Sequence, residues 1–380
     1  MLCFCHFIFG ATKITILTAD KIGLKLQKLS LIFFKNHDNW NWRGGEDIIA
    51  LAGLNGVGKT TILDAIHFLC LGKSYFSGTD VQCIQHDQPQ AGIIADILDE
   101  NVEMNNLKVK FTRGSRKKVE RNGTIYKRIA DHIGKFLAVV IAPGDIELIY
   151  GSNEVRRTFI NQILGQIHKY HLEDLMKYNK LMEHRNKHLK EEMVDYALLQ
   201  TLDEQIAPIA KRIYELRKEF LSKFSVVFAD RYHQLAGKSE SVTMVYKSQL
   251  KDNSYLKLVQ DNRGKDLAVQ RSFTGIHKDE IEINIGDVPL KKFGSQGQIK
   301  SSLIALKLAS FSYLSDETDK TPILLLDDIF EKIDEERAQV LTQLIKNDNF
   351  GQIFITDTSV ERLQSFCEEI GKPYTTITLD

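Results

Sequence analysis

Residues 53–60 read Gly-Leu-Asn-Gly-Val-Gly-Lys-Thr and fit the phosphate-binding pattern GxxxxGK[ST] in full. A strand-like stretch, 47–52, precedes this segment, and apolar residues recur at helical spacing over 62–69 after it. The glycines allow backbone N–H groups to point at phosphate oxygens, and the helix adds the positive end of its dipole. A glycine-rich turn with an exposed lysine is the alternative, and the flanking strand and helix argue against it. The chain is therefore expected to fold around a strand, a phosphate loop and a helix.

An acidic pair after a second apolar strand supplies the partner that a phosphate loop needs for Mg²⁺. Lys59 is expected to reach the β- and γ-phosphates of ATP, and the Thr60 hydroxyl to bind Mg²⁺. Asp327 ends the apolar strand 323–326 and is the second predicted Mg²⁺ ligand. Asp328 is predicted as the general base, so that Lys59 and Asp328 are the catalytic candidates; alternatively, the two aspartates only terminate a strand. The predicted ATP-binding residues are Gly53, Leu54, Asn55, Gly56, Val57, Gly58, Lys59, Thr60 and Thr61.

A serine and a glycine stand at the expected start of a long helix, within residues 293–302. Such a start forms an anion cradle, although an ordinary helix cap has the same sequence. The Ser-x-Gly-Gln order resembles the composite site of ABC-type ATPases, in which this segment of one protomer caps the γ-phosphate bound to the other. The resemblance implies an ATP-dependent homodimer with two ATP molecules between its protomers. The residues implied for the cap are Ser295, Gly297, Gln298 and, in the D-loop, Asp334.

The spacing of apolar residues changes twice along the chain. These changes divide the predicted ATPase head into two segments that are separated in the sequence. Short strands and turns run to about 150, with a hairpin turn expected at Asn122-Gly123. Apolar residues then recur every three or four positions up to 236, and Pro208 is expected to kink or divide the second of these helices. Strand patterns return afterwards, at 242–247 and 280–285. The predicted fold is an α/β, ABC-type P-loop ATPase head (24–150 and 240–380) with a helical arm domain (151–239) inserted in sequence.

Residues 1–23 are predicted to be a disordered extension. The apolar run 1–10 imitates a signal peptide, but no Lys or Arg precedes it and it is too short to span a membrane. No other stretch approaches a transmembrane helix, so a cytoplasmic protein without a membrane partner is expected. The five cysteines, at 3, 5, 70, 83 and 367, show no CxxC spacing, which favours free thiols over a half metal site at Cys3 and Cys5.

Seven segments, in order, resemble those of the RecF family of bacterial DNA-repair proteins. They are residues 26–36 (first strand and NFRN turn), 53–61 (GxNGxGKT), 143–157 (PEDLxLVxGxPxxRR), 184–189 (QRNxxL), 274–279 (TGPHRDD), 293–301 (FxSQGQxR) and 322–334 (PILLLDDVxSELD). The resemblance covers the chain from about residue 24. Departures from the family pattern are Lys35, Lys278 and Lys300 in place of Arg, and Ile276 in place of Pro. Arg and Lys are not equivalent at bidentate phosphate sites, so the changes are expected to affect individual contacts of these side chains and not the resemblance to the family.

The resemblance implies a weak, DNA-stimulated ATPase with ATP and Mg²⁺ as cofactors. It implies an ATP-driven dimer that binds double-stranded DNA near single-strand gaps and helps RecO and RecR load a recombinase, in recombinational repair, replication-fork maintenance and the SOS response. A transporter ATPase subunit is a rival, but transporters place the Ser-x-Gly-Gln segment much closer to the phosphate loop, whereas Ser295 follows Lys59 by 236 residues. An SMC-type ATPase would carry far longer heptad helices. A scaffold that has lost hydrolysis is disfavoured, because both Asp327 and Asp328 are present.

The charge balance does not indicate a DNA partner, because 50 Lys and Arg face 50 Asp and Glu. DNA contacts therefore require local basic patches. One candidate is a basic run near residue 115, and the other is the arm; for both, an ordinary solvated face is the alternative. The DNA-binding candidates are Arg113, Arg116, Lys117, Lys118, Arg185 and Lys187.

Overall fold

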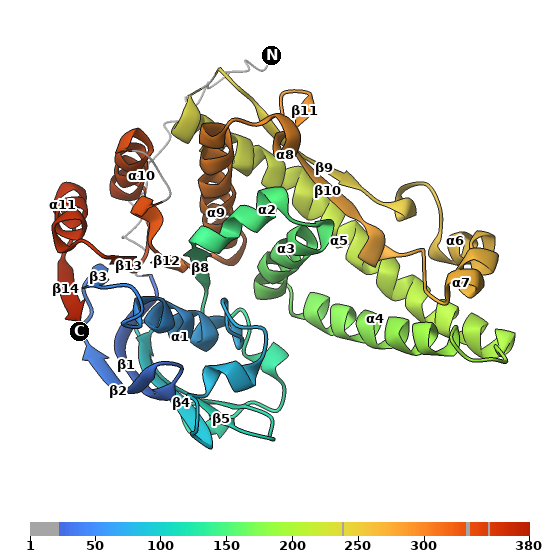
Figure 1. Cartoon of the computed structure of the whole chain (residues 1–380), viewed down its shortest axis with the longest axis horizontal. Coiled ribbons are helices and arrows are strands. Elements are labelled where there is room, and N and C mark those ends of the chain that lie inside the picture. The colour runs from blue at the N-terminus through green and yellow to red at the C-terminus, as the bar shows by residue number, and fades with distance from the viewer. Residues whose placement is uncertain (1–22, 238, 332–334, 349) are drawn as a thin grey trace, which may run out of the picture.

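The computed structural model describes residues 23–331, 335–348 and 350–380, apart from residue 238. Its head combines two sheets, and helix α1 (Lys59–Leu71) contacts strands of both. A long arm of helices extends away from the head (Figure 1). The predicted extension 1–23 lies outside the described residues, except for Gly23.

The first sheet of the head is antiparallel, with the order β2-β1-β4-β5-β6-β7. Alternate side chains of β4 and β5 are buried, so one face of the sheet covers the core. Asn122 and Gly123 join β6 to β7 and both have positive φ, as a type I′ turn requires, so the predicted hairpin is confirmed. The strands are β1 (Lys25–Phe34), β2 (His37–Arg43), β4 (Gln90–Leu98), β5 (Met104–Thr112), β6 (Lys118–Arg121) and β7 (Thr124–Ile125).

The second sheet is parallel throughout, with the order β14-β3-β13-β12-β8. Every residue of β8, β12 and β13 is buried, as expected for strands that are covered on both faces. All residues of α1 except Thr60 are at least nine-tenths buried, because this helix also contacts β4 and β5 of the first sheet. The α/β prediction is therefore confirmed. The strands are β3 (Ile48–Gly53), β8 (Ala138–Ile141), β12 (Ile323–Leu326), β13 (Ile353–Asp357) and β14 (Tyr374–Leu379).

Helix α5 (Tyr196–Ala236) belongs to both parts of the molecule. Phe220, Phe224 and Phe228 in its second half lie in the main core, and the helix packs along α9 (Gln296–Thr318). Its first half packs against α4 (Lys169–His188) around a second hydrophobic core. Pro208 is expected from the sequence to kink or divide this helix. Division is wrong, because the helix is continuous through Pro208, which lies on the exposed side while Ile206 and Ile209 stay packed in the second core; the kink stays a prediction.

The predicted arm boundaries, 151–239, need correction in both directions. The second core also contains Leu250, Tyr255, Val259 and Ile276, from segments that the sequence assigned to the head. Conversely, α3 (Asn153–Ile167) packs on α9 and its apolar residues belong to the main core. Helical periodicity marks where a helix runs but not which core its apolar face enters, and this is why the boundaries were wrong.

The remaining elements are a three-stranded antiparallel sheet, β11-β10-β9, and shorter helices. Among the described ranges, no helix combines the length and the apolar composition needed to cross a bilayer. Cys70, Cys83 and Cys367 are buried and free, whereas Cys3 and Cys5 lie outside the described residues. The elements are β9 (Val242–Lys247), β10 (Glu280–Ile285), β11 (Val288–Pro289), α2 (Glu147–Tyr150), α6 (Tyr255–Asp261), α7 (Arg263–Val269), α8 (Leu290–Phe293), α10 (Glu335–Asn347) and α11 (Val360–Ile370).

Candidate nucleotide-binding site

The loop between β3 and α1 is built on three glycines with positive φ, Gly53, Gly56 and Gly58. A Cβ on Gly53 would lie 2.6 Å from the Leu379 carbonyl oxygen, and one on Gly58 would lie 2.4 Å from the His37 Nε2 atom. Both positions therefore need glycine for space as well as for backbone conformation. Helix α1 begins directly after Gly58, so the positive end of its dipole faces the loop (Figure 1).

Lys59 is folded back over this loop and is buried. Its Nζ donates to the Gly53 carbonyl at 2.7 Å and to the Leu54 carbonyl at 3.0 Å. Within the described part of the chain, no carboxylate lies within ion-pair distance of this ammonium group. A buried cation beside a helix N-terminus attracts anions, so the loop has the electrostatics of a phosphate site.

Two hydroxyl groups converge on one carboxylate oxygen beside the loop. Thr60 Oγ1 donates to Asp327 Oδ1 at 2.9 Å, and Thr356 Oγ1 donates to the same oxygen at 3.0 Å. Burial raises the pKa of the Asp327 carboxyl, and the two hydroxyl groups only partly oppose this effect. A hydroxyl and a buried carboxylate are hard oxygen ligands, so Thr60 and Asp327 fit a divalent cation whose charge would offset the burial of Asp327.

Asp328 follows directly and has a left-handed backbone, with φ of 42°. This conformation is uncommon for a residue with a side chain, and it is strained. The Asp328 N–H donates to Thr356 Oγ1 at 2.9 Å, so a single buried hydroxyl contacts both acidic residues. Sequence reasoning missed Thr356; its signal was a polar residue at the end of the apolar strand 353–357.

The turn between β1 and β2 holds the phosphate loop from outside. Asn36 Nδ2 donates to the Gly56 carbonyl at 3.1 Å, while Asn36 Oδ1 accepts from Thr61 Oγ1 at 2.6 Å. His37 Nε2 lies 3.2 Å from the Gly58 carbonyl oxygen. Burial lowers the pKa of His37, so the neutral ring donates through Nε2. The sequence placed Asn36 in a family turn but did not connect either residue with the loop.

Ser295 caps helix α9 and is exposed. Its Oγ accepts from the Gln298 N–H at 3.2 Å, while the Gln298 side chain accepts from the Ser295 N–H at 2.7 Å. The start of α9, next to α8, lies away from α1 in Figure 1, so the structure does not bring Ser295, Gly297 and Gln298 to the P-loop of the same chain. Asp334 lies outside the described residues.

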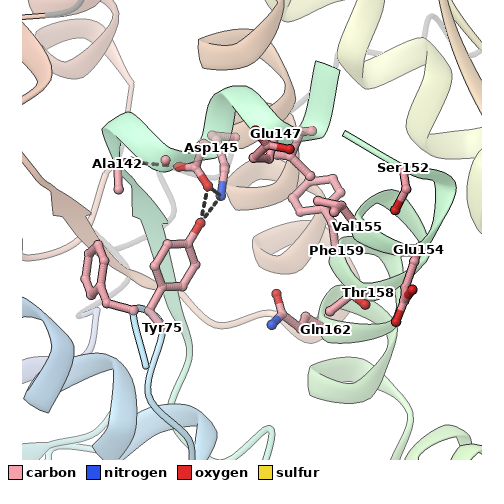
Figure 2. A pocket seen from close by; sticks show the side chains of 14 residues that line it. Tyr75, Ala142, Asp145, Glu147, Ser152, Glu154, Val155, Thr158, Phe159 and Gln162 are labelled. Carbon is pink, nitrogen blue, oxygen red and sulfur yellow. Dashed lines mark hydrogen bonds and ion pairs between the residues drawn. The ribbon is translucent and has the colours of Figure 1, made fainter. Parts of the chain in front are cut away.

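A buried ionic contact connects α9 to the segment that follows α1. Lys307 Nζ lies 2.7 Å from Asp145 Oδ1 and donates to the Tyr75 hydroxyl at 2.7 Å. Figure 2 shows Tyr75 and Asp145 in hydrogen-bond contact at the edge of a cavity of about 570 Å³. Asp64 of α1 accepts from the Tyr75 N–H at 2.7 Å, so the contact continues into the helix that follows the phosphate loop.

The candidate DNA contacts in the basic run have different environments. Arg116 and Lys118 are exposed, and Arg113 is exposed while its Nε donates to the Gln88 carbonyl at 2.8 Å. Lys117 is ion-paired with Asp80 at 2.8 Å, which leaves it less available. On the arm, Lys187 is exposed.

The prediction that Arg185 contacts DNA is wrong, because its side chain is completely buried. Arg185 Nε donates to Asp203 Oδ1 at 2.6 Å, and one of its terminal nitrogens lies 2.8 Å from Asp266 Oδ2. The same nitrogen donates to Ser272 Oγ at 2.6 Å. Arg185 therefore ties α4 to α5 and to the segment after α7.

Comparison with known proteins shows the family of the chain. A family model described as an AAA domain matches residues 28–225. The chain is 39% identical over 355 residues to the DNA replication and repair protein RecF of Flavobacterium johnsoniae, covering 92% of this chain and 99% of that protein. It is 37% identical over 350 residues to RecF of Porphyromonas gingivalis, covering 92% and 96%.

The similarity extends to solved structures. The recombination mediator protein RecF with ATP, in the RecFOR pathway, matches with a TM-score of 0.83 at 26% identity, covering 90% of this chain and 94% of that chain. An Smc head domain from Pyrococcus furiosus matches with a TM-score of 0.55 at 16% identity, covering 94% of each chain. The fold and the site thus define an ABC-type P-loop ATPase head. The chain belongs to the RecF family of DNA replication and repair proteins, which decides against the transporter and SMC alternatives.

Proposed function

We propose that this chain is a cytoplasmic, ATP-dependent DNA-binding protein of recombinational repair and replication-fork maintenance. ATP drives two copies together, and the dimer binds double-stranded DNA near single-strand gaps. RecO- and RecR-type partners then use the dimer to load a recombinase. The observation that carries the proposal is the convergence of Lys59, Thr60 and Asp327 beside the phosphate loop of a RecF-family chain. The solved RecF relative with ATP supports the choice of nucleotide.

In this proposal residues 53–61 bind ATP. Their N–H groups and the Lys59 ammonium neutralise the phosphates, while Thr60 and Asp327 hold Mg²⁺, which supplies further positive charge when bound. Asp328 accepts a proton from the water that attacks the γ-phosphorus atom, and the products are ADP and phosphate. Thr356 supports this step, because its hydroxyl holds the backbone of Asp328 next to the carboxylate of Asp327. Hydrolysis is weak and is stimulated by DNA.

The second half of the ATP site comes from the other protomer. Ser295, Gly297 and Gln298 are to cap the γ-phosphate, together with Asp334. Two observations support this arrangement: Ser295 is exposed, and the start of α9 lies away from α1 of the same chain (Figure 1). A Ser-Gly helix start that faces solvent is free to receive an anion from outside.

For DNA, the proposal uses the exposed basic residues of both parts of the molecule. These are Arg113, Arg116 and Lys118 on the head, with Lys117 as a weaker member, and Lys187 on the arm. A dimer presents these residues twice, so its DNA affinity falls more steeply with salt than that of one protomer.

Sedimentation velocity tests the nucleotide and the DNA together. The wild-type chain is expected to be monomeric alone, dimeric with Mg²⁺ and ATP, and to co-sediment with a short duplex only as the dimer. Lys59→Ala is expected to lose most ATP affinity, because the charge-assisted contact with phosphate is gone. It should therefore neither dimerise with ATP nor co-sediment with the duplex. Lys346→Ala removes an exposed lysine of α10 and is the matched control. Unchanged ATP affinity in Lys59→Ala would contradict the proposal.

A further inference from the structure

We infer that the arm carries a phosphate-backbone site for duplex DNA, in a groove between α4 and residues 271–278. The inference rests on the proposed function, since it says where the arm touches DNA. Two family-like segments, 184–189 and 274–279, meet at this groove, although neither contributes a residue to the nucleotide site described above. The groove has a volume of about 670 Å³.

The floor of the groove is held rigidly. Asn186 Oδ1 accepts from the Ser272 N–H and from the Ser272 hydroxyl, each at 2.8 Å. The neighbouring Arg185 is the buried cation that binds Asp203, Asp266 and Ser272. These contacts fix α4 against the segment 271–278, so the groove exists without any ligand to assemble it. A site that is already ordered pays less entropy on binding.

One wall of the groove is neutral. The Tyr178 hydroxyl lies 2.8 Å from His277 Nδ1, and His277 Nε2 lies 3.4 Å from the Ser272 carbonyl oxygen. Burial and the nearby Lys278, Arg157 and Arg271 lower the pKa of His277 to about 4, so the ring is uncharged at neutral pH. A Cβ on Gly275 would lie 2.4 Å from the Tyr178 oxygen, and this explains the glycine of the motif.

The open side of the groove is basic. Lys187 lies in the last turn of α4 and Lys190 in the turn that follows the helix; both line the groove, and Arg271 contributes from the opposite segment. All three are exposed, and none has a carboxylate within ion-pair distance among the residues that the structure describes. Glu183 is the single acidic side chain among the described residues that line the groove. An excess of three cationic side chains over one carboxylate favours an anionic ligand.

The lining favours nucleic acid over an acidic protein. Lys is depleted in the cores of protein–protein interfaces, which are built around aromatic and aliphatic anchors. Here Met182 is the single aliphatic residue of the lining, and it is buried. Lys, Arg and Asn side chains are usual donors to phosphate and sugar oxygens. A row of such donors without an apolar anchor fits a sugar-phosphate backbone, which positions DNA without reading its sequence.

The test is the salt dependence of duplex binding by the full chain with Mg²⁺ and ATP, followed by fluorescence anisotropy. The variant combines Lys187→Gln, Lys190→Gln and Arg271→Gln. We expect DNA affinity to fall about tenfold or more. The slope of log K against log salt is expected to become shallower by close to one unit for each lost phosphate contact, which is about 3 for each protomer and about 6 for a dimer that places both grooves on the duplex. ATP affinity and ATP-driven dimerisation are expected to stay at wild-type levels.

Two controls accompany this variant. Lys187→Arg with Lys190→Arg keeps the charges and is expected to retain DNA binding. The second control removes three exposed lysines of the arm that do not line the groove: Lys211→Gln, Lys218→Gln and Lys257→Gln. An unchanged salt slope in the groove variant, or an equal loss in this second control, overturns the inference. Intact DNA binding with lost binding to a RecR-type partner overturns it in favour of a protein ligand. A wild-type chain that binds neither ATP nor duplex refutes the proposed function instead.

Discussion

Replacing Arg185 with methionine is expected to destabilise the arm without touching any DNA contact. The guanidinium has no exposed surface and lies between two carboxylates, Asp203 at 2.6 Å and Asp266 at 2.8 Å. Methionine fills much of the same space. Among the described residues it leaves Asp266 buried without an ion-pair partner, and Asp203 with only Arg263, whose terminal nitrogen lies 3.9 Å from Asp203 Oδ2. Removal of one partner from a buried ion pair costs about 3–5 kcal/mol of unfolding free energy. Lys187→Met, on the exposed side of the same helix, is expected to change stability by less than about 0.5 kcal/mol.

The loss of unfolding free energy in Arg185→Met is expected to be smaller at lower pH. Burial already raises the pKa of Asp203, and Arg185 opposes this rise. Without Arg185 the pKa of the folded state rises further above that of the unfolded chain, so the folded state binds more protons. Stability then falls as pH increases, and the deficit of Arg185→Met is smaller in mildly acidic buffer than at neutral pH. Adding Asp203→Asn and Asp266→Asn removes the unpaired charges and is expected to recover most of the loss.

Urea denaturation followed by circular dichroism measures these free energies, and hydrogen exchange of the α4 amides assigns them to the arm. The prediction is contradicted if Arg185→Met costs less than about 1 kcal/mol, well below the range for a broken buried pair. A loss of DNA affinity at unchanged stability would instead restore Arg185 as a DNA contact, against its burial in the structure.

Three further predictions concern the nucleotide site. Thr356→Val is expected to lower the steady-state rate of ATP hydrolysis about 10- to 100-fold with little change in ATP affinity, because it removes a hydroxyl that contacts both Asp327 and Asp328. Thr356→Ser keeps the hydroxyl and should hydrolyse ATP at the wild-type rate in the same assay. Asp328→Asn is expected to bind ATP but hydrolyse it at least about 100-fold more slowly, and to remain dimeric in sedimentation velocity; wild-type hydrolysis would place the base elsewhere. Ser295→Arg is expected to bind ATP as a monomer but not to dimerise, with Ser295→Ala as the milder comparison, and a variant that still dimerises would refute the composite site.

The local features of the fold could be predicted from the sequence because their signals are short-range. The strands 242–247, 280–285 and 323–326 have the predicted bounds, and the loop 53–60 has its expected strand and helix. Even the pairing of Thr60 with Asp327, 267 residues apart, followed from what a phosphate loop requires.

The errors arose where a residue's role depends on a distant partner. Arg185 looked like one more basic residue on a polar helix, because nothing near it shows that Asp203 and Asp266 fold against it. Thr356 gained its role only when β13 was placed beside β12. The second core draws on residues from 178 to 276, and periodicity cannot tell which helices share a core. Pairing across long sequence distance is the information that local patterns lack.

The continuity of α5 has a mechanical consequence. A helix of 41 residues is about 60 Å long. One half of it is anchored on α9, whose N-cap is Ser295, and the other half supports the arm. A rigid lever of this length converts a rotation of about 10° at α9 into a displacement of roughly 10 Å at the far end of the arm. Spectroscopic labels near Tyr196 should therefore report nucleotide-driven movement with much greater amplitude than labels in the head.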